Sequence, residues 1–577
     1  MKKDQKEEIT IPEFMEDFHV DIDASYFPPK AGSTAEEGFY EEPEESSFEE
    51  DLVPQGSCQE EDLVQEAAFT WEDKKNERNR RGKVKGKTKG RKRRKPQQEK
   101  TGREAHLDKD SNRPILVTTW FFVLLFVALI LRFAGFIYFE SSQVVNNSYN
   151  QRQDVLAESV VRGKILSRDG EVLAETKTTK KGKEFRYYPY GELFCHVVGR
   201  TEHGKTGIEL SQSIHLLTSG TNLFSRIITQ LNGEKPEGNH VITTLDVKLQ
   251  QAAFDALGTQ KGAIVVLEPS TGKILAMVSK SGYDPNTLSE NWETLSSDNR
   301  NTPLINRATQ GLYPPGSSFK LLTSLAFLRQ KKAAGYEFDC PGKGIYSSVS
   351  ISCFNGTVHG KENLYDSFAN SCNTSFANIG LQLDLERFRN LCNRCMFNEE
   401  LPAGFSCAKS SFVLSGTSKK SEVPQTVIGQ GNTQISPFHN AMLAAAVANR
   451  GVVMKPYLIE SVKTASQSEV MKNHPESYRR IMSKKEARIL REMMRGVVTQ
   501  GTAAQLNSSL YEAAGKTGSA EFNSKKDTHA WFIGFAGQAG GKKPDIAISV
   551  LVENSGSGGV YAVPAAKKVF DAYYSAQ

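Results

Sequence analysis

The longest apolar run of the chain lies toward its N-terminal end. From Pro114 to Phe139 the sequence is PILVTTWFFVLLFVALILRFAGFIYF, with Arg132 as its single charge. About 20 apolar residues in a helix cross a bilayer, and Arg132 is close enough to one end of the run to reach the headgroups. The run starts too far along the chain to be a cleaved signal peptide. The pattern predicts one transmembrane helix over 114–139, with a buried core helix as the less favoured alternative.

The pattern changes in the C-terminal half, where strand-like and helix-like segments alternate. GAIVVLEPSTGKILAMVSK (262–280) has two apolar runs around a Pro-Ser-Thr-Gly turn, which predicts a hairpin. Further strands are predicted for HAWFIGFAG (529–537) and DIAISVLVE (545–553). Helical periodicity fills the interval, in FKLLTSLAFLRQ, ISPFHNAMLAAAVANR and KKEARILREMMRGVV. Strands at both ends with helices between them predict one α/β domain, whose sheet is closed by the two ends of the segment.

A smaller module is predicted for residues 140–255. It contains RGKILSRDGEVLAET, two strand-like runs around a turn at Asp169 and Gly170. It has no cluster of carboxylates and no metal-ligand spacing, so we expect it to be non-catalytic. A helix-like segment, LDVKLQQAAFDAL, ends at Gly258 and leads into the larger domain, which is predicted to span 256–577.

The distribution of charge gives the topology. The 577 residues carry a formal net charge of +5, but residues 1–73 hold 23 Asp/Glu against 4 Lys/Arg, and residues 74–113 hold 18 Lys/Arg against 5 acids. Such blocks bury too little apolar surface to fold, so residues 1–113 are predicted to be a disordered tail. The basic block directly precedes the apolar run, which places the N-terminus in the cytoplasm and everything after about residue 140 outside. Beside a membrane, the basic block is expected to contact anionic lipid and not nucleic acid.

Serine followed three residues later by lysine is the first motif with chemical meaning. A serine hydroxyl needs an adjacent base to act as a nucleophile, and positions i and i+3 of a helix share a face. The pattern occurs at Ser270/Lys273, Ser317/Lys320 and Ser406/Lys409. Ser270 lies on the predicted hairpin turn, and Ser406 lies in a loop-like stretch. Only Ser317 precedes a long helical run, where N–H groups and the helix dipole favour negative charge. A helix cap with a chance lysine is the alternative.

Two further short motifs also occur in several copies, and their positions favour one copy of each. Lys-Thr-Gly begins at Lys100 in the tail, at Lys205 in the small module and at Lys516 before the strand HAWFIGFAG. A glycine on a strand lets a substrate backbone approach closely, and a lysine beside hydroxyl groups suits a carboxylate. Ser-x-Asn triplets are common, but only Ser371-Cys372-Asn373 falls between Ser317 and Lys516.

The order of the three motifs is more specific than any one of them. PPGSSFK, NSCNTSF and GKTGSAE with HAWFIGFAG resemble the penicillin-binding proteins, the D,D-transpeptidases of bacterial cell-wall synthesis. The blocks LEPSTGKILAMVS, VIGQGNTQISPFHNAMLAAAVANRGVVMKP and RGVVTQGTA match as well, and the likeness covers about residues 160–570. RGKILSRDGEVLA resembles the family's pedestal module, and no stretch resembles a glycosyltransferase. The resemblance is therefore to the monofunctional class B type.

The resemblance implies a fold. It is an α/β transpeptidase domain of the serine β-lactamase type, with an antiparallel sheet and a helical cluster. A small β-rich pedestal, or dimerisation-like, module precedes this domain, after one transmembrane helix and the disordered tail.

The resemblance also implies the roles of the motif residues. Ser317 would be the acylated nucleophile, and Lys320 its base. Ser371 would pass a proton to the leaving amine, and Asn373 would hydrogen-bond the substrate amide.

The third motif would bind the donor. Lys516 would support the electrostatics, and Thr517 and Ser519 would bind the terminal carboxylate, with Gly518 between them. The backbone N–H groups of Ser317 and Ser519 would form the oxyanion hole. Ser519 stands where threonine is commoner in this class, but the hydroxyl group is kept.

The activity implied is cross-linking of peptidoglycan stem peptides through a serine ester, with covalent binding of β-lactams. No cofactor or metal is implied. The expected location is the bacterial plasma membrane, where a polytopic glycosyltransferase of the cell-wall machinery would be the partner. Two alternatives stay open: a D,D-carboxypeptidase or β-lactamase that transfers the acyl group to water, and a β-lactam sensor or non-catalytic scaffold of the division or elongation machinery.

The cysteines give weaker signals. Cys340 and Cys353 flank a loop and can pair as a disulfide in an oxidising compartment. Cys392, Cys395 and Cys407 lie near one another but have no fitting histidine, which disfavours zinc. Cys372 is expected to pack inward. His359 and His529 lack the spacing of a Ser-His-Asp site, so we expect core or edge histidines.

Overall fold

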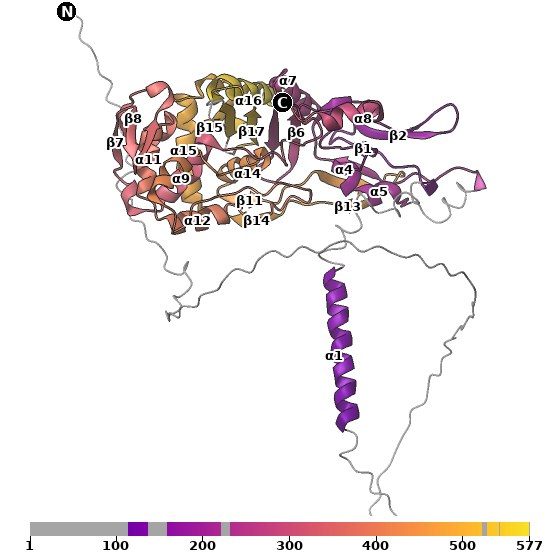
Figure 1. The fold of residues 1–577 in the computed structure, drawn as a ribbon. Coiled ribbons are helices and arrows are strands. Elements are labelled where there is room, and N and C mark those ends of the chain that lie inside the picture. Colours follow the sequence, from indigo (N-terminus) through magenta and orange to yellow (C-terminus); the bar gives the residue numbers. More distant parts are fainter. Residues whose placement is uncertain (1–112, 137–157, 221–230, 522–527, 542, 576–577) are drawn as a thin grey trace, which may run out of the picture. The chain divides into compact units, whose positions relative to one another are not determined.

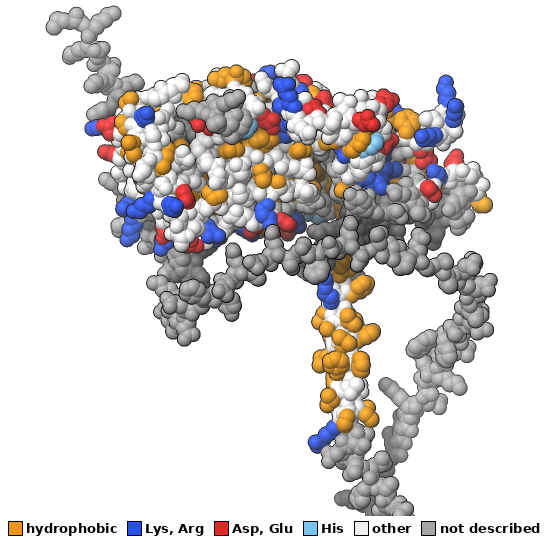
Figure 2. All heavy atoms as spheres, viewed as in Figure 1, with side chains coloured by type: hydrophobic (Ala, Val, Ile, Leu, Met, Phe, Trp, Pro, Cys, Tyr) orange, Lys and Arg blue, Asp and Glu red, His pale blue; other side chains and the backbone are white. Residues whose placement is uncertain are grey.

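The computed structural model describes residues 113–136, 158–220, 231–521, 528–541 and 543–575. Helix α1 (Arg113–Gly135) carries the predicted apolar run, and it is the one helix in these ranges that is long and apolar enough to cross a membrane. Hydrophobic side chains cover the face of α1 that is in view in Figure 2. Arg113, the last residue of the predicted disordered tail, begins α1, whereas residues 1–112 and the last residues of the predicted span, 137–139, lie outside the described residues.

The larger domain is built on a five-stranded antiparallel sheet in the order β15-β16-β17-β5-β6. Its strands are β5 (Gly262–Leu267), β6 (Ile274–Lys280), β15 (Tyr511–Glu521), β16 (Thr528–Gln538) and β17 (Ile546–Val552). The predicted hairpin is confirmed as β5 and β6, and the two predicted C-terminal strands as β16 and β17. All residues of β5 and β17 are buried. This explains their continuous apolar sequence, since strands covered on both faces show no alternation.

Helices cover both faces of this sheet. α7 (Val247–Leu257) and α16 (Gly558–Ser575) pack together on one face, and α14 (Pro437–Ala448) lies against the other (Figure 1). α14 starts where Ser436 accepts a hydrogen bond from the His439 amide, with Pro437 at the first helical position. α15 (Lys484–Thr499), which packs along β15, starts at a capping box of Ser483 and Glu486. Two of the predicted helices are therefore confirmed as α14 and α15, and local capping explains where these two begin.

The motif residues lie at the junction between this sheet and a helical lobe. The 3-10 turn η6 (Gly316–Phe319) continues into α9 (Lys320–Leu328) and packs against β15. The other helices of the lobe are α10 (Leu364–Ala369), α11 (Asn373–Leu381), α12 (Leu385–Arg394) and α13 (Val423–Thr426). Two small strand pairs lie beside them, β7 (Glu337–Cys340) with β10 (Gly360–Asn363), and β8 (Lys343–Tyr346) with β9 (Val349–Ser352).

The smaller module contains a second, six-stranded sheet in the order β13-β12-β4-β1-β2-β3. Its strands are β1 (Ile165–Leu166), β2 (Val172–Thr178), β3 (Glu184–Tyr187), β4 (His240–Thr243), β12 (Ile459–Lys463) and β13 (Glu469–Lys472). The predicted strands around Asp169-Gly170 are confirmed as β1 and β2. Strands β12 and β13 come from the later segment of the chain, so the two parts share this sheet, and β12 pairs directly with β4.

The remaining elements are short or peripheral: α4 (Gly207–Ser211), α5 (Ser213–Leu217), α8 (Leu288–Ser297), and the antiparallel pair β11 (Val452–Met454) and β14 (Ser477–Arg480). α4 carries Glu209, which is buried between two arginines. Arg162 and Arg186 each place a guanidinium Nε atom 2.7 Å from one of its carboxylate oxygens. Because an unpaired buried charge is costly, the three side chains link β3 and the segment before β1 to α4.

Candidate active site

Ser317 lies on the turn η6, immediately before α9. Gly316 precedes it with φ +54°, a conformation that favours glycine. A Cβ atom on Gly316 would lie 2.7 Å from the carbonyl oxygen of Ser519, so this position has no room for a side chain. The turn leaves Ser317 partly exposed, whereas its neighbour Ser318 is buried. Ser317 is thus the accessible hydroxyl group of the turn.

Lys320 is the first residue of α9 and is fully buried. Its Nζ atom donates hydrogen bonds to the carbonyl oxygen of Ser371 and to Oδ1 of Asn373, each at 2.7 Å, and lies 3.3 Å from Oγ of Ser371. Burial lowers the pKa of the Lys320 ammonium group to about 8. Lys320 therefore joins the first motif to the second, with a side chain that loses its proton more easily than an exposed lysine.

Ser371 lies on the turn between α10 and α11, and Asn373 is the first residue of α11. Ser371 has φ +57°, and Cys372 caps α11 by accepting a hydrogen bond from the amide of Ser375. Nδ2 of Asn373 donates to the carbonyl oxygen of Ser352 at 2.9 Å. Cys372 is fully buried, which confirms that it packs inward. The inward turn of Cys372 leaves the two polar side chains on either side of it available to the site.

The third motif lies on β15, one of the two edge strands of the five-stranded sheet. Lys516 is fully buried, and burial together with the nearby charge of Lys320 holds the pKa of its ammonium group well below its usual value. Its Nζ atom donates to the carbonyl oxygen of Thr517. The hydroxyl groups of Thr517 and Thr502 lie 2.5 Å apart, and Oγ of Ser519 accepts a hydrogen bond from the amide of Gly558. Hydroxyl groups and a buried lysine therefore lie together on this edge strand.

Turn η6 and strand β15 meet backbone to backbone. A Cβ atom on Gly518 would lie 3.1 Å from the amide nitrogen of Ser318 and 3.2 Å from the carbonyl oxygen of Pro315. The indole of Trp531, on β16, donates to the carbonyl oxygen of Pro314 at 3.0 Å. These contacts fix the third motif against the first, and Gly518 is the residue that permits the close approach.

The other copies of the motifs are separate from this site. Ser270 lies on the turn between β5 and β6, and Lys273 pairs with Glu460. Ser406 and Lys409 are exposed in an irregular segment. Lys205 precedes α4 in the smaller module, and Lys100 lies outside the described residues. Among the described copies of these two motifs, only those at Ser317 and Lys516 therefore lie at this site.

Several neighbours of the site had no role in the sequence-based prediction. Thr502 bonds to Thr517, and Gln430 donates from Nε2 to the carbonyl oxygen of Ser519. Asn440 donates to the hydroxyl group of Ser318. Gln430, Asn440 and Thr502 lie in the segments VIGQGNTQISPFHNAMLAAAVANRGVVMKP and RGVVTQGTA, which resemble the family, but nothing in those segments indicates which side chain reaches the site.

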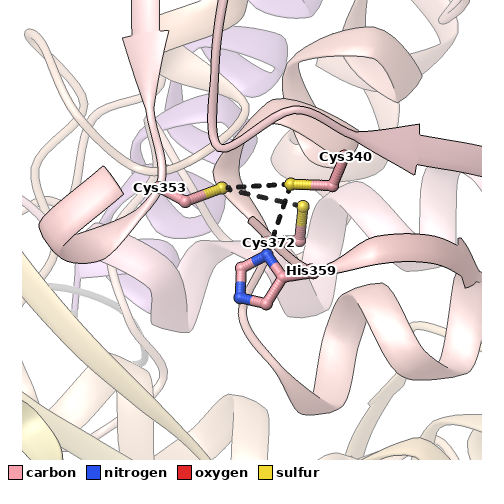
Figure 3. Close-up of side chains that lie close together, drawn as sticks. All are labelled: Cys340, Cys353, His359 and Cys372. Carbon is pink, nitrogen blue, oxygen red and sulfur yellow. Dashed lines mark hydrogen bonds between the residues drawn. The ribbon is translucent and has the colours of Figure 1, made fainter. Parts of the chain in front are cut away.

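The cysteines are arranged differently from the prediction. All seven cysteines in the described part of the chain are free thiols, and the Sγ atoms of Cys340 and Cys353 are 3.7 Å apart, so the expected disulfide is not formed. Cys372 and His359 complete a group with them, shown in Figure 3. In the described ranges this is the one group of histidine, cysteine or acidic side chains with metal-binding geometry, so Cys392, Cys395 and Cys407 do not form one. His529 is a buried histidine whose Nδ1 accepts from the Asn554 amide, as expected of a core residue.

Comparisons with known proteins agree with this geometry. Residues 262–571 match the model of the penicillin binding protein transpeptidase domain, and residues 162–241 match that of the penicillin binding protein A dimerisation domain. The chain is 33% identical over 460 residues to the peptidoglycan D,D-transpeptidase PbpA of Mycobacterium tuberculosis, covering 73% of this chain and 91% of PbpA. It is 31% identical over 451 residues to MrdA of Acinetobacter baumannii, covering 67% of this chain and 65% of MrdA.

Solved structures extend the likeness to three dimensions. The penicillin G acyl-enzyme complex of penicillin-binding protein A from M. tuberculosis superposes with a TM-score of 0.65 at 31% identity, over 72% of this chain and all of that one. The D,D-transpeptidase domain of a peptidoglycan glycosyltransferase from Eggerthella lenta gives the same TM-score at 29% identity, over 73% of this chain and 99% of that one. The chain therefore belongs to the penicillin-binding proteins, as a class B transpeptidase.

Proposed function

We propose that this peptidoglycan D,D-transpeptidase works through an acyl-enzyme on Ser317, with Lys320 as the base. The assignment rests on the position of Lys320. This residue follows Ser317 by one turn, and its Nζ atom bonds directly to Ser371 and Asn373. The related protein from M. tuberculosis forms acyl-enzymes with penicillin G and imipenem, and this supports the same chemistry here. Ser317 is the only hydroxyl group that is partly exposed on η6 and precedes a lysine by one turn.

Acylation begins with proton transfer. Neutral Lys320 takes the proton of Ser317, and Oγ attacks the carbonyl carbon between the two D-alanines of the donor. The backbone N–H groups of Ser317 and Ser519 receive the negative charge that develops on the carbonyl oxygen. The C–N bond then breaks, the leaving D-alanine takes a proton through Ser371, and an ester on Ser317 remains.

Deacylation reverses these steps with a different amine. An amino group of a neighbouring stem peptide attacks the ester carbon and gives up a proton, and Ser317 leaves as the restored alcohol. Thr517 and Ser519 hold the carboxylate of the donor during acylation, and Lys516 supports the negative charge. A β-lactam enters the same path, but its leaving nitrogen stays attached to the acyl group.

We expect the rate of acylation by a penicillin to rise with pH through about 8, the pKa of Lys320. The base must be neutral, and below its pKa the neutral fraction falls about tenfold per pH unit. The second-order rate constant, measured with a fluorescent penicillin at each pH, should therefore increase through this range and then level off. The spontaneous hydrolysis of the penicillin and the thermal unfolding of the protein are measured at the same pH values. A rate that is constant or falls from pH 6 through about 8 contradicts Lys320 as the base.

An assay with an amine acceptor distinguishes transfer of the acyl group to an amine from its hydrolysis by water. We expect purified full-length protein in detergent, given a donor peptide ending in D-Ala-D-Ala and a labelled amine acceptor, to yield mainly the transfer product by mass spectrometry. The Ser317→Ala variant should yield neither product. Hydrolysed peptide without transfer product would identify a carboxypeptidase instead. Rapid turnover of a chromogenic cephalosporin would identify a β-lactamase, and growth of a depletion strain on the Ser317→Ala gene would identify a scaffold.

The membrane arrangement belongs to the same proposal. The basic residues before α1 support an N-terminus in the cytoplasm of a bacterial cell and a catalytic domain outside the plasma membrane. The donor and acceptor peptides are then on the same side as the site. A polytopic glycosyltransferase is the proposed partner, since it would supply the glycan strands to be cross-linked.

A further inference from the structure

Three sulfur atoms and one imidazole nitrogen converge beside the second motif (Figure 3). Sγ of Cys353 lies 3.7 Å from Sγ of Cys340 and 3.8 Å from Sγ of Cys372, and Nδ1 of His359 lies 3.3 Å from Sγ of Cys340. All four atoms lie within 4.8 Å of one another. The three thiols are buried, with Cys340 and Cys372 fully so, and His359 is partly exposed.

These separations fit tetrahedral coordination. With Zn–S bonds of about 2.3 Å, two sulfurs of a tetrahedron are about 3.8 Å apart, and a sulfur and a nitrogen about 3.6 Å apart. Backbone amides already donate to two of the sulfurs, from Gly342 to Cys340 and from Ser375 to Cys372. N–H donors to sulfur are the outer contacts that stabilise thiolate ligands. From this geometry we propose that Cys340, Cys353, His359 and Cys372 bind one structural zinc ion.

A disulfide explains the cluster less well. A sulfur–sulfur bond of about 2.0 Å joins only two thiols, whereas Cys353 lies almost equally far from two others. One disulfide would leave a third buried thiol and His359 without a role. A four-ligand Cys₃His set closes the coordination sphere of zinc and uses every member. Binding releases the three thiol protons to solvent, and His359 binds as a neutral ring.

The ion would join the ends of β7, β9, β10 and α11 beside the second motif. Cys340 ends β7, Cys353 follows β9, His359 precedes β10, and Cys372 caps α11. Cys372 stands between Ser371 and Asn373, and Asn373 bonds to Ser352, the neighbour of Cys353. Zinc would thus position Ser371 and Asn373 through the residues next to them in the chain. This positioning effect rests on the proposed roles of those two residues, whereas the metal site does not.

Metal content tests the site without any reference to activity. We expect full-length protein, purified in detergent without chelators, to contain about one zinc per chain by mass spectrometry of the elements. The variants Cys340→Ser and His359→Ala should lose it, whereas Cys407→Ser, a cysteine outside the cluster, should keep it. Because His359 is partly exposed, the His359→Ala variant should fold more readily than the Cys340→Ser variant. Cobalt(II) added to the metal-free wild type should give the absorption of a tetrahedral thiolate complex.

Each result decides the proposal. A protein that holds no zinc and takes up no cobalt after reduction overturns it, as does a disulfide between Cys340 and Cys353 found by non-reducing peptide mapping. Zinc retained by both cluster variants places the ion elsewhere and also overturns it. For the positioning effect, the acylation rate should fall on metal removal and recover when zinc is returned. Acylation that is absent even with zinc bound would count against the proposed function and not against the metal site.

Discussion

Replacing Lys320 by methionine is expected to slow acylation by a penicillin about 10²- to 10⁴-fold, the usual contribution of a positioned base. This corresponds to about 3 to 5 kcal/mol in the activation free energy. Methionine keeps most of the buried volume of the side chain, but it removes the proton acceptor for Ser317 and the hydrogen bonds to Ser371 and Asn373. The measurement is the second-order rate constant for labelling by a fluorescent penicillin.

Two further variants test whether Lys320 acts as a base or only as a structural positive charge. Lys320→Arg keeps a positive charge but cannot lose its proton at these pH values, so it should be as slow as Lys320→Met. Lys273→Met changes the lysine of another Ser-x-x-Lys pattern, which pairs with Glu460 away from the site, and it should label at the wild-type rate. Labelling by Lys320→Arg at nearly the wild-type rate would show that Lys320 is not the base.

Replacing Ser317 by alanine is expected to abolish the covalent adduct altogether, because the bond to the acyl group is made by its Oγ atom. Ser318→Ala is the matched control. Ser318 is the adjacent serine, but it is buried, with its hydroxyl group donating to Pro315 and accepting from Asn440. Its loss should cost about 1 kcal/mol of stability and leave labelling intact. Thermal unfolding of both variants shows whether they fold.

The sequence predicts well those elements whose signals are local. The hairpin at 262–280 was predicted from its turn, and the helices that begin after Ser436 and Ser483 from their apolar periodicity. The pairing of β12 with β4 is not readable in this way, because it joins segments more than two hundred residues apart, and their register depends on the folded module. The division of the chain at residues 255 and 256 stays a prediction.

The residues of the site can also be divided into those that local sequence patterns predict and those that they do not. The eight motif residues were predicted from short patterns and their order, and the structure brings Lys320, Ser371 and Asn373 into contact. Their roles in the reaction stay predictions. The partners Thr502 and Gln430 could not be predicted, because their hydrogen bonds depend on tertiary distances. The cysteine cluster was not predicted either, since its four members between residues 340 and 372 follow no familiar zinc spacing and meet only in the folded structure.

In the proposed mechanism Ser317 carries the acyl group, and mass spectrometry can locate that group directly. Full-length protein is reacted with penicillin G and digested, and fragmentation mass spectrometry locates the modified residue. We expect a single penicilloyl group on Ser317 in wild type and none in Ser317→Ala. An adduct on any other residue, including Ser270, Ser318 or Ser406, or an adduct that persists in Ser317→Ala, would contradict it.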